Sequence, residues 1–492
     1  MAASGVVPEL AGGRPVFGGR LNQSHPIMRT MSVVLPCADE RDNALKTVER
    51  FCERTPLDIL KEIIVVDDGS TPPLSELFAS DSRQLLKHKR CNVRIVRHEL
   101  TIGLMAAKLT GGKAALGDVI GFFDCHVAPQ LHWEREIMQK IQENPRRMVV
   151  PAITDIDMDT FDEKVNSAVN AKCYLTFDAD FKWFDDESDY VPTISGGLAA
   201  MSREWFNLTG GFDEQMHGWG GENLDQSLRM WQCGGEIMRA KSSRIAHMWR
   251  AGDPRTRAHY SVKAKGTDNR GRVVSAWYDA FIPFYRGHAV PREQTQNYES
   301  FKHKLACKPF SYFLYRFRKM YVEGGVIPRE EFLLREKSTG LCLTGHGMGT
   351  AGSACDAKNH KQVFQQGNVD QDAHPGKCCS GIRQAQSNNC LDFFNENGAN
   401  WYSCDISGKN ANQHYRFRKD GRIVKGIDNP KTCLYLKKEE HHAVQKKPCD
   451  ELTGDVGIWE RVHAKETRLY ETYLSEVAKH GYAEEFPDLP DN

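Results

Sequence analysis

The sequence predicts a protein of two domains, an α/β domain with a parallel sheet and an all-β domain with threefold internal repetition. Strand-like and helix-like segments alternate from residue 26 to 305, which is typical of a parallel sheet covered by helices. Residues 330–463 instead repeat one cysteine-containing pattern three times. Units of about 45 residues cannot each bury an apolar face alone, so we expect the three to close into one β structure. The other segments are an N-terminal arm (1–25), a linker (306–329) and a C-terminal helix with an acidic tail (464–492).

The elements of the α/β domain follow from apolar runs of strand length and from helical spacing between them. Two of the strands end in acidic residues, at Asp67–Asp68 and at Asp124. Ligands of open parallel sheets bind beyond the carboxyl ends of the strands, so both acidic tips are candidate site residues. The expected strands are Met31–Leu35 (stopped by Pro36), Ile63–Val66, Val93–Val96 and Val119–Phe123, and the expected helices are Asn43–Arg54 and Gly103–Ala115.

Paired cysteines define the repeats of the all-β domain. The members of the three pairs are 13, 14 and 16 residues apart. A zinc site requires closer spacing of the CxxC type, so this regularity indicates disulfides formed in an oxidising compartment. The pairs are Cys342/Cys355, Cys390/Cys404 and Cys433/Cys449, and the repeats close with the triplets Gln362–Phe364, Gln413–Tyr415 and Gly457–Trp459.

Composition limits the class of protein. The chain has 492 residues, enough for several domains of about 100–200 residues. Its 65 basic and 65 acidic residues give a formal net charge of zero, which argues against a protein that mainly coats nucleic acid. No apolar run approaches the roughly 18–20 residues that span a bilayer. We therefore expect a soluble chain, or the soluble part of a longer membrane-anchored protein.

The first candidate site is Asp67–Asp68–Gly69–Ser70, at the end of a buried strand. A carboxylate in this position can accept hydrogen bonds from uracil or ribose. The same residues also suit a tight turn, because Asp and Gly favour turn backbone. The sequence leaves both interpretations open.

The second candidate is a metal site at Asp124–Cys125–His126. In extended backbone alternate residues share a face, so Asp124 and His126 point the same way. A carboxylate and an imidazole suit Mn²⁺ or a similar ion and leave positions for phosphate oxygens. His247 can complete the site from a distant part of the chain, and Arg250 can neutralise pyrophosphate. The alternative is a strand-end cap with incidental histidines.

The third candidate is the glycine- and acid-rich segment Gly218–Asp225. Consecutive glycines let the backbone approach a ligand closely. Glu222 and Asn223 can hydrogen-bond to sugar hydroxyls, and Trp219 can lie over a sugar or a diphosphate. The alternative is a helix N-terminus with acidic residues that suit the helix dipole. Capping alone does not account for so dense a run of Gly, Trp and acid.

Taken in order, these motifs resemble those of the polypeptide N-acetylgalactosaminyltransferases. The resemblance runs from about Met31 to Trp459 and implies an α/β GT-A catalytic domain, with Rossmann-like nucleotide-sugar binding, followed by a ricin-type β-trefoil lectin domain. The most specific matches are Gly210–Gly235, Lys61–Asp68 and Cys307–Phe310.

The resemblance implies roles for particular residues. It implies Mn²⁺ held by Asp124, His126 and His247, UDP-GalNAc as the donor, and a mobile loop of about residues 250–268 that closes over the nucleotide. It also implies a disulfide between Cys233 and Cys307. Nucleotide-sugar contacts are implied for Asp67, Asp68, Gly103, Asp124, Gly196, Gly197, Trp219 and Arg250, catalytic roles for Trp219, Glu222, Asn223 and Arg250, and a peptide groove for Trp183 and Trp249.

Some positions depart from the family pattern. Residues 36–40, Pro-Cys-Ala-Asp-Glu, stand where the first strand of the family usually ends in Thr-Phe-His-Asn-Glu. Asp253 and Arg255 stand where the family commonly has His and an aromatic residue, and a second family disulfide has no cysteine near Ala240. These departures indicate a divergent member, which we expect from a protist such as an apicomplexan. The cysteines without an evident family partner are Cys37, Cys52, Cys91, Cys125, Cys173, Cys378 and Cys379.

The lectin resemblance predicts one sugar site. In such lectins an Asp after Cys-Leu accepts hydrogen bonds from GalNAc, and only Asp392 of the second repeat stands in that position. Asn412 lies downstream, and Trp401 or Tyr402 offers a stacking face. We expect the first and third repeats to be structural.

The sequence therefore predicts a retaining glycosyltransferase that moves GalNAc from UDP-GalNAc to Ser or Thr hydroxyls of polypeptides and so initiates mucin-type O-glycosylation. The acceptors are peptides and GalNAc-glycopeptides, not nucleic acid, and the lectin domain binds GalNAc already attached. By resemblance we expect a location in the Golgi lumen and a type II membrane anchor outside this sequence. The alternatives are a retaining glycosyltransferase of other donor or acceptor specificity, and a catalytically inactive GalNAc-binding lectin.

Overall fold

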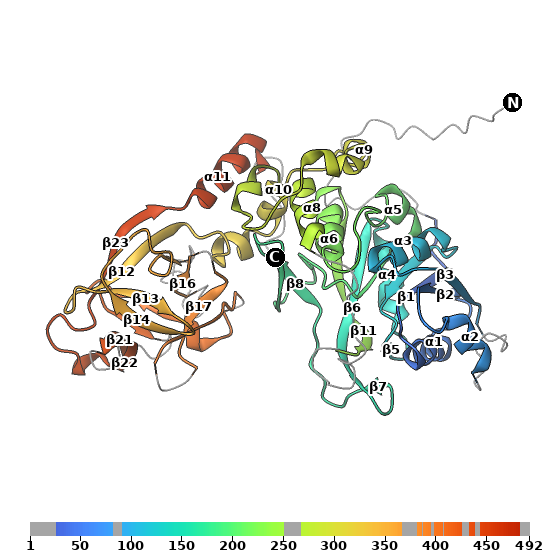
Figure 1. The fold of residues 1–492 in the computed structure, drawn as a ribbon, viewed down its shortest axis with the longest axis horizontal. Coiled ribbons are helices and arrows are strands. Elements are labelled where there is room, and N and C mark those ends of the chain that lie inside the picture. Colours follow the sequence, from blue (N-terminus) through green and yellow to red (C-terminus); the bar gives the residue numbers. More distant parts are fainter. Residues whose placement is uncertain are drawn as a thin grey trace. The chain divides into compact units, whose positions relative to one another are not determined.

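The computed structural model divides the chain into two compact units, each described here by itself (Figure 1). The first unit takes in Met1–Ala171, Ile194–Asn269 and Glu293–Lys308, and the second takes in Lys172–Thr193, Arg270–Arg292 and Pro309–Asn492. The domain boundaries drawn from the sequence stay a prediction. The structure describes residues 26–81, 91–249, 267–366, 381–385, 387–394, 398–406, 408–425, 432–437 and 443–482. Within these ranges no helix is long and apolar enough to cross a membrane.

One mixed sheet forms the centre of the first unit. Its strands are β1 (Met31–Cys37), β2 (Leu60–Asp68), β3 (Val93–His98), β4 (Val119–Phe123), β5 (Val127–Pro129), β6 (Arg147–Asp157), β7 (Asp162–Glu163), β10 (Leu198–Ser202) and β11 (Glu236–His247). They lie in the order β3-β2-β1-β4-β10-β6-β11-β5, with β7 beside β6. The four strands predicted from the sequence are parallel. Beyond them β10 runs antiparallel to β4 and β6, and β5 runs antiparallel to β11. β11 is parallel to β6. The sheet is therefore continuously parallel from β3 to β4 and mixed beyond β4.

Helices cover both faces of the parallel half. Alternate residues of β1 face opposite sides, so Val33 and Leu35 share a buried cluster with Phe51 of α1, whereas Val34 faces α3. A Cβ added to Gly111 of α3 would lie 2.2 Å from Val34 Cγ1. Glycine therefore lets α3 lie directly on the sheet. The helices are α1 (Asp42–Arg54), α2 (Leu74–Ser80), α3 (Leu104–Ala114), α4 (Glu134–Glu143), α5 (Arg203–Leu208), α6 (Glu222–Gln232), η2 (Arg292–Tyr298) and α9 (Glu299–Lys304).

The ends of the first elements differ slightly from prediction. β1 continues through Pro36 to Cys37, which pairs with Asp67 of β2. Pro36 is the last residue but one of the strand, where the missing N–H disturbs the ladder least. β2 also reaches further, to Asp68. The paired backbone of β1 and β2 therefore extends as far as Asp67, at the acidic end of β2.

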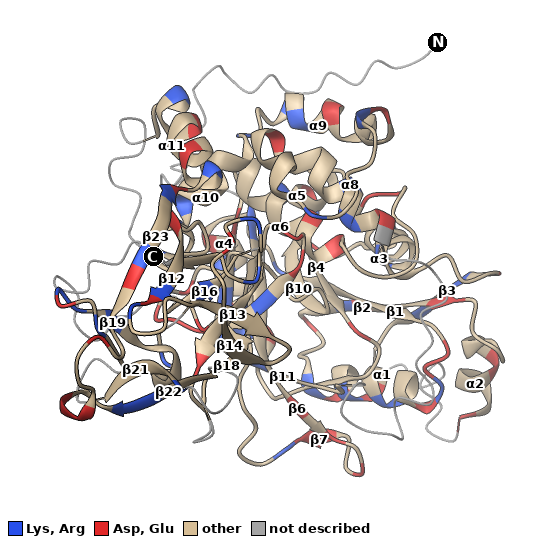
Figure 2. Cartoon of the chain, turned by 60° about the vertical axis from the view of Figure 1, so that its left-hand side comes forward, with Lys and Arg blue, Asp and Glu red and all other residues tan. Residues whose placement is uncertain are grey.

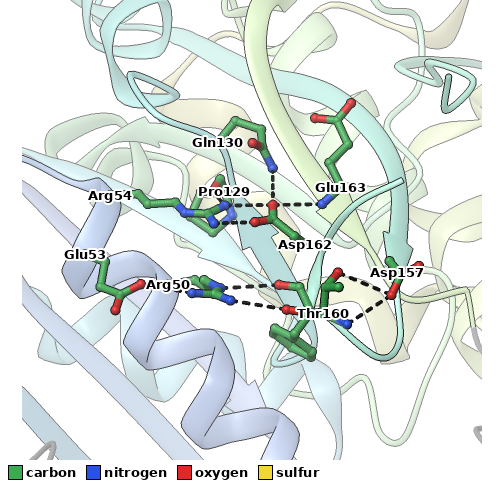
Figure 3. A network of polar contacts seen from close by, with 10 residues as sticks. Arg50, Glu53, Arg54, Pro129, Gln130, Asp157, Thr160, Asp162 and Glu163 are labelled. Carbon is green, nitrogen blue, oxygen red and sulfur yellow. Dashed lines mark hydrogen bonds and ion pairs between the residues drawn. The ribbon is translucent and has the colours of Figure 1, made fainter. Parts of the chain in front are cut away.

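A polar network fixes the β6–β7 hairpin to α1. Figure 2 shows acidic β7 in red, and Figure 3 shows its contacts with α1. Arg54 donates two hydrogen bonds to Asp162, at 2.9 and 2.5 Å, and one to the carbonyl of Pro129. Arg50 donates to the carbonyls of Thr160 and Phe161. The basic face of α1 therefore holds the hairpin that continues from the carboxyl end of β6.

The all-β repeats form a β-trefoil in the second unit. An eight-stranded path runs in the order β13-β14-β18-β17-β16-β15-β12-β23, and pairing of β13 with β12 closes it; β19-β20-β21-β22 form a four-stranded sheet. The strands are β12 (Glu330–Glu336), β13 (Cys342–His346), β14 (Gly349–Ser353), β15 (Phe364–Gln366), β16 (Arg383–Gln384), β17 (Asn389–Asp392), β18 (Asn400–Ser403), β19 (Tyr415–Phe417), β20 (Ile423–Lys425), β21 (Thr432–Lys437), β22 (Ala443–Pro448) and β23 (Trp459–Glu466).

Equivalent residues of the three repeats meet in one core. The leucines that follow the first cysteine of each repeat are at most 1% exposed, and the aromatic residues that close the repeats are at most 5% exposed. Sequence repetition thus corresponds to threefold packing. The six residues, all in the same cluster, are Leu343, Leu391, Leu434, Phe364, Tyr415 and Trp459.

A helical region completes the second unit. Phe310 of α10 stacks on Tyr278 at a centroid distance of 4.4 Å. The predicted C-terminal helix is present as α11, and Tyr482 beyond it hydrogen-bonds to Ser311 of α10. The remaining elements are β8 (Lys172–Leu175), β9 (Phe181–Phe184), α8 (Thr267–Trp277), η1 (Asp279–Phe284), α10 (Phe310–Arg316), η3 (Lys319–Glu323), η4 (Ala411–Gln413), η5 (Cys449–Glu451) and α11 (Arg468–His480).

Candidate active site

Three side chains converge beyond the carboxyl end of β4. Asp124, His126 and His247 each offer one ligand atom, and these atoms lie within 4.8 Å of one another. His247 Nε2 is 3.1 Å from Asp124 Oδ2, and the two imidazole rings are 5.0 Å apart. The structure thus brings together the three residues that the sequence predicts as metal ligands.

Strand pairing brings these residues together. His247 ends β11, and the β5–β11 pairing sets it opposite Val127, the neighbour of His126. On the other side, the backbone N–H of Asp124 donates to the carbonyl of Gly197 at 3.1 Å. Residues 124–126 form a bend and not the extended strand assumed from the sequence. Neighbouring strands, rather than alternation along one strand, therefore place the cluster.

Burial sets the protonation of the cluster. Burial lowers the pKa of both His126 and His247, which favours neutral rings with a free lone pair. Burial alone raises the pKa of Asp124, but the hydrogen bond from His247 and the neighbouring positive groups lower it to about 2. At neutral pH the site therefore presents an ionised carboxylate and neutral imidazoles, the forms that bind metal.

The donor set fits a divalent cation such as Mn²⁺. One hard carboxylate oxygen and two borderline imidazole nitrogens together suit first-row divalent ions. The buried Nδ1 of His247 has no hydrogen-bond partner among the described residues. Nδ1 of His126 lies 3.2 Å from Glu40 Oε1. A carboxylate in that position fixes ring orientation in many metal sites.

Two glycines, Gly196 and Gly197, lie between the metal cluster and the polar residues Glu222 and Asn223. Gly197 precedes β10, and a Cβ at this position would lie 2.5 Å from Asp124 Oδ2. Gly196 has φ +111°, and its Cβ would lie 3.1 Å from Glu222 Oε1 and from Asn223 Cβ. Side chains are thereby excluded between the metal cluster and the first turn of α6. The predicted Gly196, Gly197, Glu222 and Asn223 therefore share one site with Asp124.

The carboxylate of Glu222 is prepared to accept hydrogen bonds. Glu222 is 5% exposed, and its buried Oε2 has no partner among the described residues. Asn223 Nδ2 donates to the carbonyl of Ile194 at 3.1 Å, so its amide is fixed. An unpaired buried acceptor costs free energy unless a ligand satisfies it. This favours direct contact of Glu222, more than of Asn223, with a polyhydroxyl ligand.

Lys108 belongs to the site although the sequence did not single it out. It is 1% exposed on α3, donates to the carbonyl of Gly196 at 2.7 Å and lies 3.9 Å from Glu222 Oε1. Its ammonium thus supports the glycine backbone and the Glu222 charge together. The available signal was a cation among the apolar residues in the middle of the helix Leu104–Ala114, whose other lysine, Lys113, lies in the last turn.

The two acidic residues at the end of β2 are engaged by the protein itself. Asp67 is fully buried and accepts hydrogen bonds from the backbone of Ser70 and Leu74 and from Arg97 at 2.5 Å. Its carboxylate is turned inward and stabilises the turn, and the uridine contact of Asp67 stays a prediction.

Asp68 holds the start of α3. It accepts hydrogen bonds from the backbone N–H groups of Ile102 and Gly103, at 3.0 and 2.9 Å, and contacts His98 Nδ1 at 2.8 Å. A Cβ at Gly103 would lie 2.3 Å from the backbone of Gly218. The nucleotide contacts of Asp68 and Gly103 stay a prediction, and both residues position the segment before α3.

The tryptophans predicted at the site are partly exposed. Trp219 is 48% exposed in the first unit. Trp249 is 37% exposed, donates through Nε1 to Asp155 at 2.8 Å and packs edge-on against the His247 ring at 4.5 Å. Trp183, on β9 of the second unit, is 40% exposed. Their ligand contacts stay a prediction, and Arg250 lies outside the described residues.

All four predicted disulfides are present, and two more occur in the first unit. Cys233–Cys307 joins the end of α6 to the segment after α9. Cys37 pairs with Cys125 and Cys52 with Cys91. Cys173 is a buried free thiol, and Cys378 and Cys379 lie outside the described residues. The three trefoil bonds are Cys342–Cys355, Cys390–Cys404 and Cys433–Cys449.

Asp392 forms the centre of a candidate sugar site in the second repeat. It is 1% exposed, and its Oδ2 accepts hydrogen bonds from Asn410 Nδ2 and Gln413 Nε2, each at 2.9 Å. Its Oδ1 has no partner among the described residues. Asn412 lies in the same turn, η4, where its backbone N–H donates to Asn410. The protein therefore fixes the carboxylate through Oδ2, and Oδ1 can accept a hydrogen bond from a ligand.

The residues that correspond to Asp392 in the first and third repeats, Thr344 and Tyr435, contact other parts of the protein. Thr344 of the first repeat bonds to Ser353 and accepts a hydrogen bond from Gln362 at 3.0 Å, which closes the position with protein groups. In the third repeat, Gly457 replaces the glutamine, and its Cβ would lie 3.6 Å from that of Tyr435. Both observations fit the structural role expected for these repeats.

The two aromatic residues predicted as a stacking face differ. Trp401 is 4% exposed and stacks on Phe364 in the trefoil core, with centroids 5.5 Å apart. The stacking role predicted for Trp401 is therefore wrong, because its strand turns the ring inward. Tyr402, the next residue, faces outward at 55% exposure, with Phe394 at 6.0 Å. Phe394, not named from the sequence, adds a second exposed ring.

Comparison with known proteins relates this site to one enzyme family. Residues 32–208 match the family model "Glycosyl transferase family 2", and residues 183–251 match "N-terminal domain of galactosyltransferase". The chain is 31% identical over 324 residues to human polypeptide N-acetylgalactosaminyltransferase 13, an alignment that covers 62% of this chain and 57% of the relative. Over this aligned part the chain is similar to the polypeptide N-acetylgalactosaminyltransferases.

Further similarities support this relationship. Polypeptide N-acetylgalactosaminyltransferase 8 of Drosophila melanogaster is 30% identical over 318 residues, covering 58% of this chain and 50% of the relative. The chain thus spans about half the length of the curated relatives it matches. A crystal structure of GalNAc-T7 with UDP, GalNAc and Mn²⁺ aligns with a TM-score of 0.55 at 22% identity, over 88% of this chain and 81% of that chain. This structural match shows the fold, a GT-A domain followed by a β-trefoil domain. The protist origin stays a prediction.

Proposed function

We propose that this chain transfers GalNAc from UDP-GalNAc to Ser or Thr hydroxyls of polypeptides, with Mn²⁺ as cofactor. The proposal depends above all on one observation: the Asp124–His126–His247 cluster lies beside a glycine-lined position that Glu222 faces. A metal site next to an acceptor for sugar hydroxyls suits a nucleotide-sugar donor. The relationship to the GalNAc-transferases narrows the donor to UDP-GalNAc.

Each part of the site contributes a different interaction. The bound ion would supply Lewis-acid charge for the diphosphate of the leaving group. Asp124, His126 and His247 would hold that ion, while Gly196 and Gly197 let the donor approach the backbone. Glu222 accepts hydrogen bonds from the sugar and Lys108 keeps its charge balanced. From the resemblance we expect retention at the anomeric carbon, with the acceptor hydroxyl attacking from the face of the leaving phosphate.

The trefoil domain would bind GalNAc on acceptors that are already glycosylated. Asp392 presents a fixed carboxylate, one oxygen of which has no partner within the described ranges, and Tyr402 presents an exposed ring. A carboxylate beside an aromatic ring is a suitable combination for a sugar, which has hydroxyls on its rim and apolar C–H groups on its faces. A location in the Golgi lumen and a membrane anchor are expectations from the resemblance.

A donor panel tests the proposal. The purified chain is incubated with a Thr-containing peptide, Mn²⁺ and UDP-GalNAc, UDP-GlcNAc or UDP-Gal, and peptide mass is followed. We expect a single GalNAc mass increase with UDP-GalNAc only, and none after removal of Mn²⁺ with a chelator. Transfer from another donor would support a different glycosyltransferase. Absence of both transfer and UDP-GalNAc hydrolysis would support an inactive lectin.

A further inference from the structure

The end of β1 and the residues after it contact the bend at residues 124–126, which carries the predicted ligands Asp124 and His126, at two neighbouring points. Cys37, the last residue of β1, is bonded to Cys125, which lies between Asp124 and His126. Three residues further along, Glu40 Oε1 contacts His126 Nδ1 at 3.2 Å. Residues 37–40 therefore contact the segment of the two predicted ligands, Asp124 and His126, at two points.

The Cys37–Cys125 bond continues the register of the two strands. The last residues that β1 and β4 pair in the sheet are Val34 and Phe122. Cys37 and Cys125 are 88 positions apart, the same separation as that last pair, with Cα atoms 5.5 Å apart. Beyond Val34 and Phe122, β1 and β4 are no longer joined by backbone hydrogen bonds. The disulfide instead joins the segments that follow these two residues.

We propose that the Cys37–Cys125 disulfide is a positioning element of the metal site, which holds residues 124–126 in the bend from which Asp124 and His126 reach one divalent cation. The backbone of the bend is held on its other sides, by hydrogen bonds from Asp124 to Gly197 and from Met248 to His126, but its pairing with β1 has ended. Ligands that are ordered before binding avoid the entropy cost of being ordered by the ion. The disulfide therefore raises metal affinity without contributing a ligand.

The burial of this bond favours a permanent role over a redox switch. Cys37 and Cys125 are each 1% exposed, and Glu40 is 8% exposed. Reagents in solution reach such sulfur atoms only when the protein opens. Neither Cys37 nor Cys125 has an evident partner in the GalNAc-transferase pattern. The inference rests on the proposed function only in taking the cluster as a Mn²⁺ site.

A pair of matched variants tests the proposal. Cys37→Ser/Cys125→Ser removes the bond at the site. Cys52→Ser/Cys91→Ser removes the bond that joins α1 to the segment before β3. Cys91 precedes the first residues of β3, so this control lies at the amino end of the strands, whereas the metal cluster lies at the carboxyl end. Mn²⁺ affinity of the full chain is measured by titration calorimetry, and Tm is recorded for each variant.

We expect the Cys37→Ser/Cys125→Ser variant to bind Mn²⁺ about tenfold or more weakly, the size of effect seen when outer partners of metal ligands are removed. The control variant should lose Tm but keep wild-type affinity. At saturating Mn²⁺ the kcat of the first variant should recover, while the Mn²⁺ concentration for half activity stays raised. Glu40→Gln, which keeps both cysteines, should also weaken Mn²⁺ binding.

Other results would overturn the proposal. Wild-type Mn²⁺ affinity in the Cys37→Ser/Cys125→Ser variant, or equal loss in both double variants, would make the bond a general stabiliser. Failure of that variant to fold even with saturating Mn²⁺ would have the same meaning. Absence of Mn²⁺ binding by the wild-type chain would refute this proposal and the proposed function together. Mn²⁺ binding without GalNAc transfer would refute only the proposed function.

Discussion

Single glycines determine whether the site has room for a donor. At Gly197 any side chain would collide with the Asp124 carboxylate, 2.5 Å from the added Cβ. At Gly196 the backbone also has φ +111°, a conformation that residues with a Cβ rarely adopt. The space between the metal cluster and Glu222 thus depends on backbone without side chains.

Glu222→Gln is expected to impair GalNAc transfer without changing the affinity for UDP. One carboxylate oxygen is buried and has no partner in the part of the chain that the structure describes, and hydrogen bonds to a charged acceptor contribute about 1.5–3 kcal/mol each. One such bond corresponds to a loss of roughly 10- to 150-fold in kcat/KM. UDP affinity, measured by calorimetry, should stay at the wild-type value. Glu214→Gln changes an exposed carboxylate of the same unit and serves as the control. Loss of UDP binding in Glu222→Gln would place this residue at the nucleotide end.

At the scale of elements, the contact between α1 and the β6–β7 hairpin should depend on pH. The hydrogen bond from Arg54 lowers the pKa of Asp162, so the folded protein favours the ionised carboxylate. The stabilisation is complete above the ordinary Asp pKa of about 4 and is lost as the pH falls below it.

Asp162→Asn is therefore expected to lower the free energy of unfolding by about 1 kcal/mol at pH 7, a value reduced for the partial exposure of the pair. The difference from wild type should shrink steadily as the pH falls below about 4, because the unfolded wild-type chain then takes up a proton that the folded protein accepts only at a much lower pH. Urea unfolding at several pH values measures this. Glu53→Gln, which alters an exposed pair of the same helix, is the control. A difference that stays constant down to low pH would contradict the role given to the Asp162 charge.

The sequence predicted the elements of the parallel half closely, because strand-length apolar runs and helical spacing are local signals. It missed the reversal at β10 and the bend at residues 124–126, which depend on pairing with β11 and other distant strands. It identified the metal cluster from motif resemblance. It did not reveal that Asp67 and Trp401 are turned inward, because no local pattern shows which way a side chain turns. Lys108 was missed for a related reason: its partners Gly196 and Glu222 are distant in sequence.

At the scale of the whole molecule, the trefoil domain is expected to act on glycosylated acceptors only. Asp392→Ala should abolish binding of free GalNAc and remove any rate advantage of peptides that already carry a distant GalNAc. Activity on bare peptides should be unchanged, since the metal cluster belongs to the other unit. Rates on matched bare and glycosylated peptides measure both effects. Asp392→Asn, which keeps the side-chain volume, serves as a second variant if the alanine variant is unstable.

Thr344→Ala is the matched control for the lectin prediction. Thr344 stands at the corresponding position of the first repeat, where Gln362 and Ser353 already engage it. GalNAc binding should therefore be unchanged in this variant. Glycopeptide preference that survives Asp392→Ala would place recognition in another repeat or in the other unit. An equal loss on both peptides would make Asp392 structural.

The central claim is that Asp124, His126 and His247 bind the metal on which transfer depends, and His247→Ala tests it most directly. His247 contributes a buried imidazole to the cluster, whereas His303 is an exposed residue of α9, so His303→Ala is the control. Mn²⁺ affinity by calorimetry, GalNAc transfer to a Thr peptide and circular dichroism are measured together. The account predicts a folded His247→Ala protein with Mn²⁺ binding and transfer both lost, and an unaffected control. Near-normal Mn²⁺-dependent transfer by His247→Ala would contradict it.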